Sequence, residues 1–162
     1  MDETRFWSMI EAAWQSIGGK TKPRQKLVEG KLSDEKCESL METLEEEVIP
    51  ALTEELQLLT PEALSQFDRI LERKLYEIDR AEVQEATDGS NDGFLYARGF
   101  IVGMGRTFYD AVNANPSLAI MDMECEAMCY ISWHIFCEKY GEMPPSEISR
   151  ESCSNRAGWP AL

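Results

Sequence analysis

The 162-residue sequence contains one histidine, five cysteines and no apolar run close to the ~20 residues that a membrane span requires. The cysteines are odd in number and irregularly spaced, which argues against a disulfide framework and favours free, buried thiols. The first residues are charged and lack the apolar stretch of a signal peptide. These absences predict a cytoplasmic protein that does not bind membranes.

Positive charge is also scarce, because the formal net charge is −14. Residues 33–86 contain 16 acidic and 5 basic residues, and a short basic segment at 20–31 precedes them. Such a field repels phosphates, so the composition disfavours nucleic-acid binding. It leaves two interpretations open, a charge that serves solubility and a charge that attracts a basic protein partner.

Apolar residues recur at helical spacing through most of the chain, and no segment favours a strand. The pattern predicts helices over residues 2–17, 33–56 and 61–78, the second kinked at Pro50 and the third capped by Thr60. After Ile78 the polar residues 79–85 are expected to project into solvent. We predict an all-α, single-domain irregular helical bundle with a central apolar helix (94–112) and a second mostly apolar helix (124–140).

The domain boundary follows from the composition of the C-terminal segment. From residue 142 the chain becomes rich in Pro, Ser and Glu. We therefore expect a helical domain over residues 1–141 and a tail over residues 142–162, with Trp159 as the candidate anchor of the tail. The sequence leaves the oligomeric state open.

One cluster on the central helix is a candidate site. The central helix contains Gly99, Gly103 and Gly105, and because each glycine destabilises a helix interior by about 1 kcal/mol, they indicate close backbone contact with a neighbouring helix. Gly99 and Gly103 stand one turn apart. At about 100° per residue, Arg98 and Tyr109 fall within one ~60° sector of this helix, and Arg106 lies at the edge of that sector. Buried arginines need partners, and the carboxylates near the preceding turn are the candidates: Asp79, Glu82, Asp88 and Asp92. The cluster is then either a structural ion-pair network or an anion or nucleotide pocket with Asp92, Arg98, Arg106 and Tyr109 as binding residues.

Metal and nucleophilic sites fail on geometry. Cys125, Cys129, Cys137 and His134 cannot converge on one ion from a single helix, because His134 points about 180° away from Cys125. The loop around Asp88 and Asp92 lacks the acid at the twelfth position of a calcium loop. The sequence therefore predicts no metal, no cofactor and no catalytic residue.

Three segments together resemble a known family. They are Arg-Phe-Trp-Ser-Met-Ile-Glu near the N-terminus, Ser-Asn-Asp-Gly-Phe-Leu-Tyr-Ala-Arg-Gly-Phe-Ile-Val with Gly105-Arg106 following, and the Asn115-Pro116 turn. They are similar to the bacterial family called domain of unknown function 4240, over most of residues 1–145. Ser90, Asp92, Phe94, Arg98, Gly105 and Arg106 match the family's pattern, whereas Asn91 replaces an Asp and the preceding residues 80–86 are charged rather than apolar. The resemblance implies a small helical bacterial protein and carries no activity with it.

These observations lead to two functional hypotheses. The first is a non-catalytic protein-interaction or regulatory module, a class that includes inhibitors of basic toxins, because the chain has an acidic helix and no nucleophile–base pair. The second is a small-molecule or anion-binding protein, enzymatic or not, with its site at Asp92, Arg98 and Arg106.

Overall fold

A computed structural model describes residues 1–87 and 90–160, and throughout these ranges the regular structure is helical, without a strand. This confirms the all-α prediction. Among the described residues, no helix is both long and apolar enough to cross a bilayer. The elements are α1 (Glu3–Ser16), α2 (Thr21–Val28), α3 (Asp34–Thr43), a π turn η1 (Leu44–Val48), α4 (Ile49–Gln57), α5 (Pro61–Glu77), α6 (Ala81–Thr87), α7 (Asn91–Gly103), α8 (Arg106–Ala114), a 3-10 turn η2 (Pro116–Leu118), α9 (Glu126–Tyr140) and a 3-10 turn η3 (Arg156–Gly158).

Several helix ends are set by capping residues that can be recognised in the sequence. The Asp2 carboxylate accepts from the backbone N–H of Arg5 at 2.8 Å and caps α1. The Thr60 hydroxyl accepts from the N–H of Ala63 at 3.3 Å, and Pro61 occupies the first position of α5, where its missing N–H costs nothing. Gly141 ends α9 with a φ of +91°, a backbone conformation that glycine adopts without steric penalty.

The predicted single helix over residues 94–112 is wrong, because the chain breaks it into α7 and α8. Gly105 has a φ of +95°, which no α-helix accommodates. A Cβ at this position would lie 2.7 Å from an Nη2 atom of Arg24, so the missing side chain also makes room for that guanidinium. The break rotates α8 relative to α7, and residues before and after Gly105 no longer share one helical face.

Where the sequence predicts a kink at Pro50, a π turn precedes the proline. The N–H of Ile49 bonds to the carbonyl of Leu44, five residues back, instead of the usual four. A proline inside an α-helix clashes with the carbonyl four residues before it and leaves that carbonyl unbonded. We attribute the wider turn to this clash, since π turns accommodate such local strain without ending the helix.

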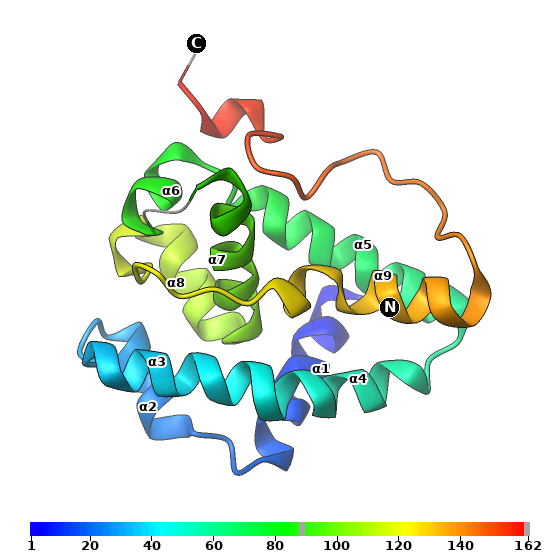
Figure 1. Ribbon diagram of the computed structural model, residues 1–162, viewed down its shortest axis with the longest axis horizontal. Helices are drawn as coiled ribbons and strands as arrows, with labels where there is room; N and C mark the ends of the chain where they lie inside the picture. The colour runs from blue at the N-terminus through cyan, green and yellow to red at the C-terminus, as the bar shows by residue number, and fades with distance from the viewer. Residues whose placement is uncertain (88–89, 161–162) are drawn as a thin grey trace.

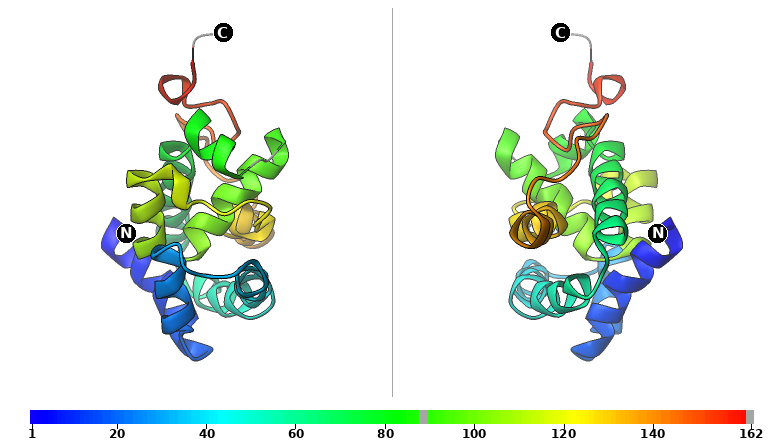
Figure 2. Two further views of the ribbon diagram at one scale, coloured as in Figure 1. Left: turned by 90° about the vertical axis from the view of Figure 1, so that its left-hand side faces the viewer. Right: turned by 90° about the vertical axis from the view of Figure 1, so that its right-hand side faces the viewer.

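Helix α7 lies in the middle of the molecule (Figure 1), packed mainly against α9 and α5. The rod formed by α3, η1 and α4 runs along one edge, and α4 packs on both α1 and α9. In both side views, α9 and the α3–α4 rod lie on the same side of the molecule (Figure 2). The predicted close helix contact exists at Gly99, where a Cβ would overlap the carbonyl oxygen of Cys125 and lie 2.6 Å from the Sγ atom of Cys129.

Residues 142–160 have little regular structure, yet they lie against the helices and arch past α9 and α5 (Figure 1). Asp79, expected in solvent, is fully buried because this segment covers it. Its carboxylate accepts from the N–H groups of Cys153 and Asn155 and from the indole N–H of Trp159, at 2.8 to 3.2 Å. Trp159 thus contacts the body of the protein, as expected of an anchor, and we call residues 142–160 the strap.

Candidate functional site

The structure places Arg98, the centre of the predicted cluster, fully inside the protein. Its guanidinium donates to the carbonyl of Leu75 at 2.8 Å and to the hydroxyl of Ser152 at 3.1 Å, and it stacks over the Phe94 ring. Burial lowers the pKa of this guanidinium below its ordinary value, and the negative charge of Asp79 acts in the opposite direction. Arg98 therefore joins α5, α7 and the strap, and its Nε atom is buried without a hydrogen-bond partner.

The other three predicted site residues lie elsewhere. Arg106 is exposed and forms an i,i+4 ion pair with Asp110 at 3.3 Å, so the expectation that it is buried is wrong. Tyr109 is buried, and its hydroxyl donates toward the carbonyl of Lys74 and a carboxylate oxygen of Glu77. Burial, followed by the charge of Glu77, raises the pKa of that hydroxyl. Asp92 is exposed in the first turn of α7.

Arg106 lines a groove of about 670 Å³ between α1, α2 and the start of α8, whereas Asp92, Arg98 and Tyr109 do not. Arg24 also lines this groove, and its guanidinium is held by the carbonyls of Met104 and Gly19 and by both carboxylate oxygens of Glu11. All the N–H groups of Arg24 are thereby engaged within the protein. Arg106, paired only at the surface, is the more accessible cation of the groove.

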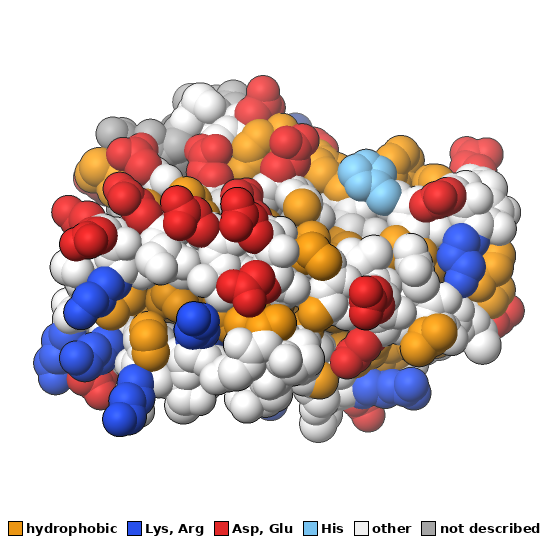
Figure 3. Space-filling view, turned by 60° about the horizontal axis from the view of Figure 1, so that its bottom comes forward, with side chains coloured by type: hydrophobic (Ala, Val, Ile, Leu, Met, Phe, Trp, Pro, Cys, Tyr) orange, Lys and Arg blue, Asp and Glu red, His pale blue; other side chains and the backbone are white. Residues whose placement is uncertain are grey.

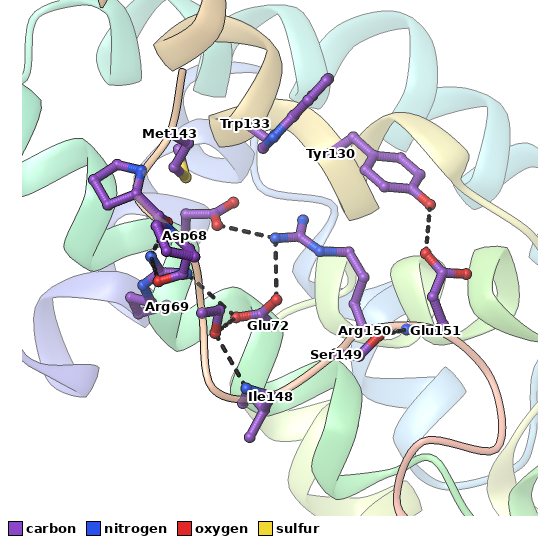
Figure 4. A pocket seen from close by; sticks show the side chains of 13 residues that line it. Asp68, Arg69, Glu72, Tyr130, Trp133, Met143, Ile148, Ser149, Arg150 and Glu151 are labelled. Atoms are coloured by element: carbon purple, nitrogen blue, oxygen red, sulfur yellow. Dashed lines mark hydrogen bonds and ion pairs between the residues drawn. The ribbon is translucent and has the colours of Figure 1, made fainter. Parts of the chain in front are cut away.

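A second cavity, of about 350 Å³, lies between α5, α9 and the strap (Figure 4). Its floor holds an ionic network in which Arg150 of the strap lies 2.9 Å from Asp68 and 3.7 Å from Glu72. The buried hydroxyl of Ser132 donates to Asp68 at 2.8 Å, and Arg69 approaches Glu72. The sequence reasoning missed this network. The sequence does contain a sign of it. Asp68 and Glu72 lie on the side of α5 that otherwise carries the apolar residues of the core, and acidic residues are rarely buried without a partner.

In the described part of the chain, no group of three or more His, Cys, Asp or Glu side chains is placed to hold a metal ion. Cys125 and Cys129 are buried, and burial raises the pKa of both thiols, that of Cys125 to about 12. Thiols in this state are poor nucleophiles. His134 lies at the surface of α9 between the rings of Tyr130 and Trp133.

The α3–α4 rod carries the largest set of unpaired charges. We call its eight exposed carboxylates the acidic ridge, namely Asp34, Glu35, Glu38, Glu42, Glu45, Glu46, Glu47 and Glu54. Within residues 1–87 and 90–160, none of them takes part in an ion pair. Acidic side chains spread across this face of the molecule, while Lys and Arg side chains gather mainly toward two of its edges (Figure 3).

Exposed apolar side chains lie beside the ridge. Of the large hydrophobic residues, Leu58, Trp133 and Tyr140 are exposed by 86%, 44% and 41%, respectively. Leu58 directly follows α4, and the Tyr140 hydroxyl donates to the carbonyl of the next residue, Leu59, at 3.3 Å. We call Leu58, Trp133 and Tyr140 the apolar patch. The patch meets the α3–α4 rod at Leu58, which lies four residues after Glu54, the last carboxylate of the ridge.

The protein is thus small and all-helical, and its surface exposes a row of carboxylates and several large apolar side chains. The chain belongs to the family described as Protein of unknown function (DUF4240), whose family model matches residues 36–138. That match spans α3 to most of α9 and includes most of the acidic ridge. No curated protein and no solved structure matches the chain.

Proposed function

We propose that this protein is a non-catalytic interaction module that binds a basic protein partner through the acidic ridge. The observation that carries the proposal is the row of eight exposed carboxylates without an ion pair along the α3–α4 rod, with the exposed side chain of Leu58 at the end of that rod. Unpaired like charges repel one another along a helix, so a partner's cations would lower the energy of this face.

The rest of the molecule supports the same interpretation. The buried charges of the strap and of α5 are engaged with one another, as Arg150, Asp68 and Glu72 show. Charged groups at an accessible face chiefly accelerate encounter and select partners, and exposed aromatic residues contribute most of the affinity at many interfaces. The acidic ridge and the apolar patch provide both kinds of group.

The experiment is an affinity capture from a lysate of the native host at low ionic strength, with two matched variants. The ridge variant carries Glu38→Gln, Glu42→Gln, Glu45→Gln and Glu46→Gln. The control variant removes the same charge from exposed acids elsewhere, through Glu82→Gln, Glu85→Gln, Glu142→Gln and Glu147→Gln.

We expect the wild-type protein and the control variant to retain one basic protein in stoichiometric amount, and the ridge variant to lose it. The captured protein should elute at about 0.5 M salt, because screening shortens the range of exposed charges to a few ångströms. The absence of any stoichiometric partner at low salt, or equal capture by both variants, would count against the proposal.

A second candidate function is the binding of a small anion in the groove of about 670 Å³ that Arg106 lines. Its volume lies in the range of small-molecule sites, and α8 presents its N-terminus there without a side-chain cap. A thermal-shift screen with nucleotides, phosphate and carboxylates tests it. A ligand that stabilises the wild-type protein and Arg5→Ala, but not Arg106→Ala, supports anion binding in the groove. If no compound raises the melting temperature of the wild-type protein, this function is ruled out.

A further inference from the structure

Resting on the proposed function, we infer that the partner segment is a cationic amphipathic helix whose apolar side docks on Trp133, Tyr140 and Leu58. The acidic ridge by itself attracts any cation. The apolar patch adds a requirement for hydrophobic anchors on the same side of the partner as its positive charges.

The geometry of α9 favours a helix as the occupant. Trp133 and Tyr140 are seven residues apart, which places them about 20° apart around α9 and about 10 Å apart along it. Side chains at positions i and i+7 of a partner helix have the same separation, because they stand two turns apart. Leu58 extends the patch from Tyr140 onto the end of α4.

The charges around the patch complement lysine and arginine at the edges of such a helix. Glu54 lies one turn before Leu58, at the end of α4. Glu151 of the strap is also exposed, and it accepts from the hydroxyl of Tyr130. The nearby cation, Lys139, is turned toward α4, where its ammonium donates to the carbonyl of Gln57. Exposed carboxylates thus lie at the Leu58 end of the patch and beside the Trp133 cavity, while the Lys139 ammonium lies over the Tyr140 ring.

Trp133 also borders a cavity, so the patch is not flat at this end. Its side chain forms part of the wall of the 350 Å³ cavity beneath the strap, together with Tyr130 and Met143 (Figure 4). An apolar side chain of the partner that packs against Trp133 is therefore partly enclosed rather than held on a flat surface. Aromatic residues in partly enclosed positions are the ones that dominate the energetics of many interfaces.

The test uses two synthetic probes of about 18 residues, which is five helical turns. One probe arranges Leu and Lys as an amphipathic helix, and the other is oligolysine. Binding is measured by calorimetry with the full chain at low salt and again at about 0.3 M salt. The variants are Trp133→Ala/Tyr140→Ala, Leu58→Ser, the ridge variant, and Met121→Ala as an exposed hydrophobic control beside α6.

We expect Trp133→Ala/Tyr140→Ala to weaken the amphipathic probe at least tenfold and to leave oligolysine binding unchanged. Leu58→Ser should also weaken the amphipathic probe, and since Leu58 is almost fully exposed, its loss cannot act by unfolding the core. Met121→Ala should bind both probes as the wild-type protein does. In high salt, oligolysine should dissociate while the amphipathic probe remains bound.

Two results separate the failure of this inference from the failure of the proposed function. If both probes bind with equal affinity and the patch variants change the affinity of neither probe, docking of an amphipathic helix on the apolar patch is ruled out. The acidic ridge can then still be the docking face. If the ridge variant binds both probes as tightly as the wild-type protein, the proposed function itself fails.

Discussion

The guanidinium of Arg150 lies 2.9 Å from the carboxylate of Asp68, with the two side chains only 9% and 1% exposed. This pair joins the strap to α5, although 82 residues separate the partners along the chain. A buried carboxylate without its cation is strongly unfavourable, so Arg150 holds the strap in place and also neutralises a charge that α5 alone could not bury. Four predictions follow from this and related contacts.

Arg150→Ala should lower the free energy of unfolding by about 3–5 kcal/mol, the usual consequence of removing one partner of a buried ion pair. Urea denaturation monitored by circular dichroism measures the change. Arg156→Ala, which removes an exposed arginine from the same segment, should stay within about 0.5 kcal/mol of the wild-type protein. Equal stabilities for the two variants would show that the strap is not held by this pair.

Gly99→Ala should destabilise the protein by about 1–3 kcal/mol, because the new Cβ overlaps the backbone of Cys125, which cannot easily move. Gly103→Ala is the matched control, since its Cβ would meet only the methyl ends of Leu44, and alanine favours the helix by up to about 1 kcal/mol. We expect the control to be nearly neutral in thermal and urea unfolding. A neutral Gly99→Ala would contradict the close contact between α7 and the start of α9.

Cysteine reactivity should separate exposed from buried thiols. At pH 8 the Cys125 thiol stays protonated, because burial raises its pKa to about 12. We expect Ellman's reagent to modify Cys153 first and Cys137 more slowly, with Cys37, Cys125 and Cys129 protected until the protein unfolds. Cys153→Ser should remove the fast phase. Rapid modification of all five thiols in the native protein would rule out this core.

The Glu11–Arg24 pair should make stability depend on pH in the acid range. Burial raises the pKa of Glu11, but hydrogen bonds from Arg24 and Gln15 and the charge of Arg24 outweigh it, so the folded pKa lies below the ordinary 4.5. A lowered folded pKa means that the unfolded chain takes up the proton more readily, so this contribution is complete above about pH 5 and disappears as the pH falls through the folded pKa.

Urea titrations of Glu11→Gln and wild-type protein test this dependence. The variant should be the less stable protein at pH 7, and the difference should shrink toward about pH 3. Glu85→Gln, at an exposed position on α6, serves as the control without such a trend. A difference that grows on acidification would reverse the sign and overturn the assignment.

The helices themselves were largely predictable because their signals are local. Thr60 and Pro61 mark the start of α5, Gly141 marks the end of α9, and the apolar spacing identifies the buried sides between such signals. The density of glycine also indicated correctly that Gly99 meets a neighbouring helix at close range. Each of these inferences needs only a few consecutive residues and the period of the helix.

The candidate site was less predictable because it depends on one torsion angle and on long-range contacts. A glycine in a helical pattern can continue the helix or end it, and at Gly105 the approach of Arg24 accompanies the break. That break exposes Arg106 and separates it from Arg98, so the predicted cluster does not assemble in one place.

Composition and periodicity alone therefore determined the all-helical class, the approximate limits of α1, α5 and α9, and the acidic surface, since propensity, capping and charge act through neighbours in the chain. Tertiary structure alone decided which charges are buried. Asp68, Asp79 and Arg98 became interior groups only when the strap, from the far end of the sequence, supplied the donors and acceptors that compensate for their loss of water.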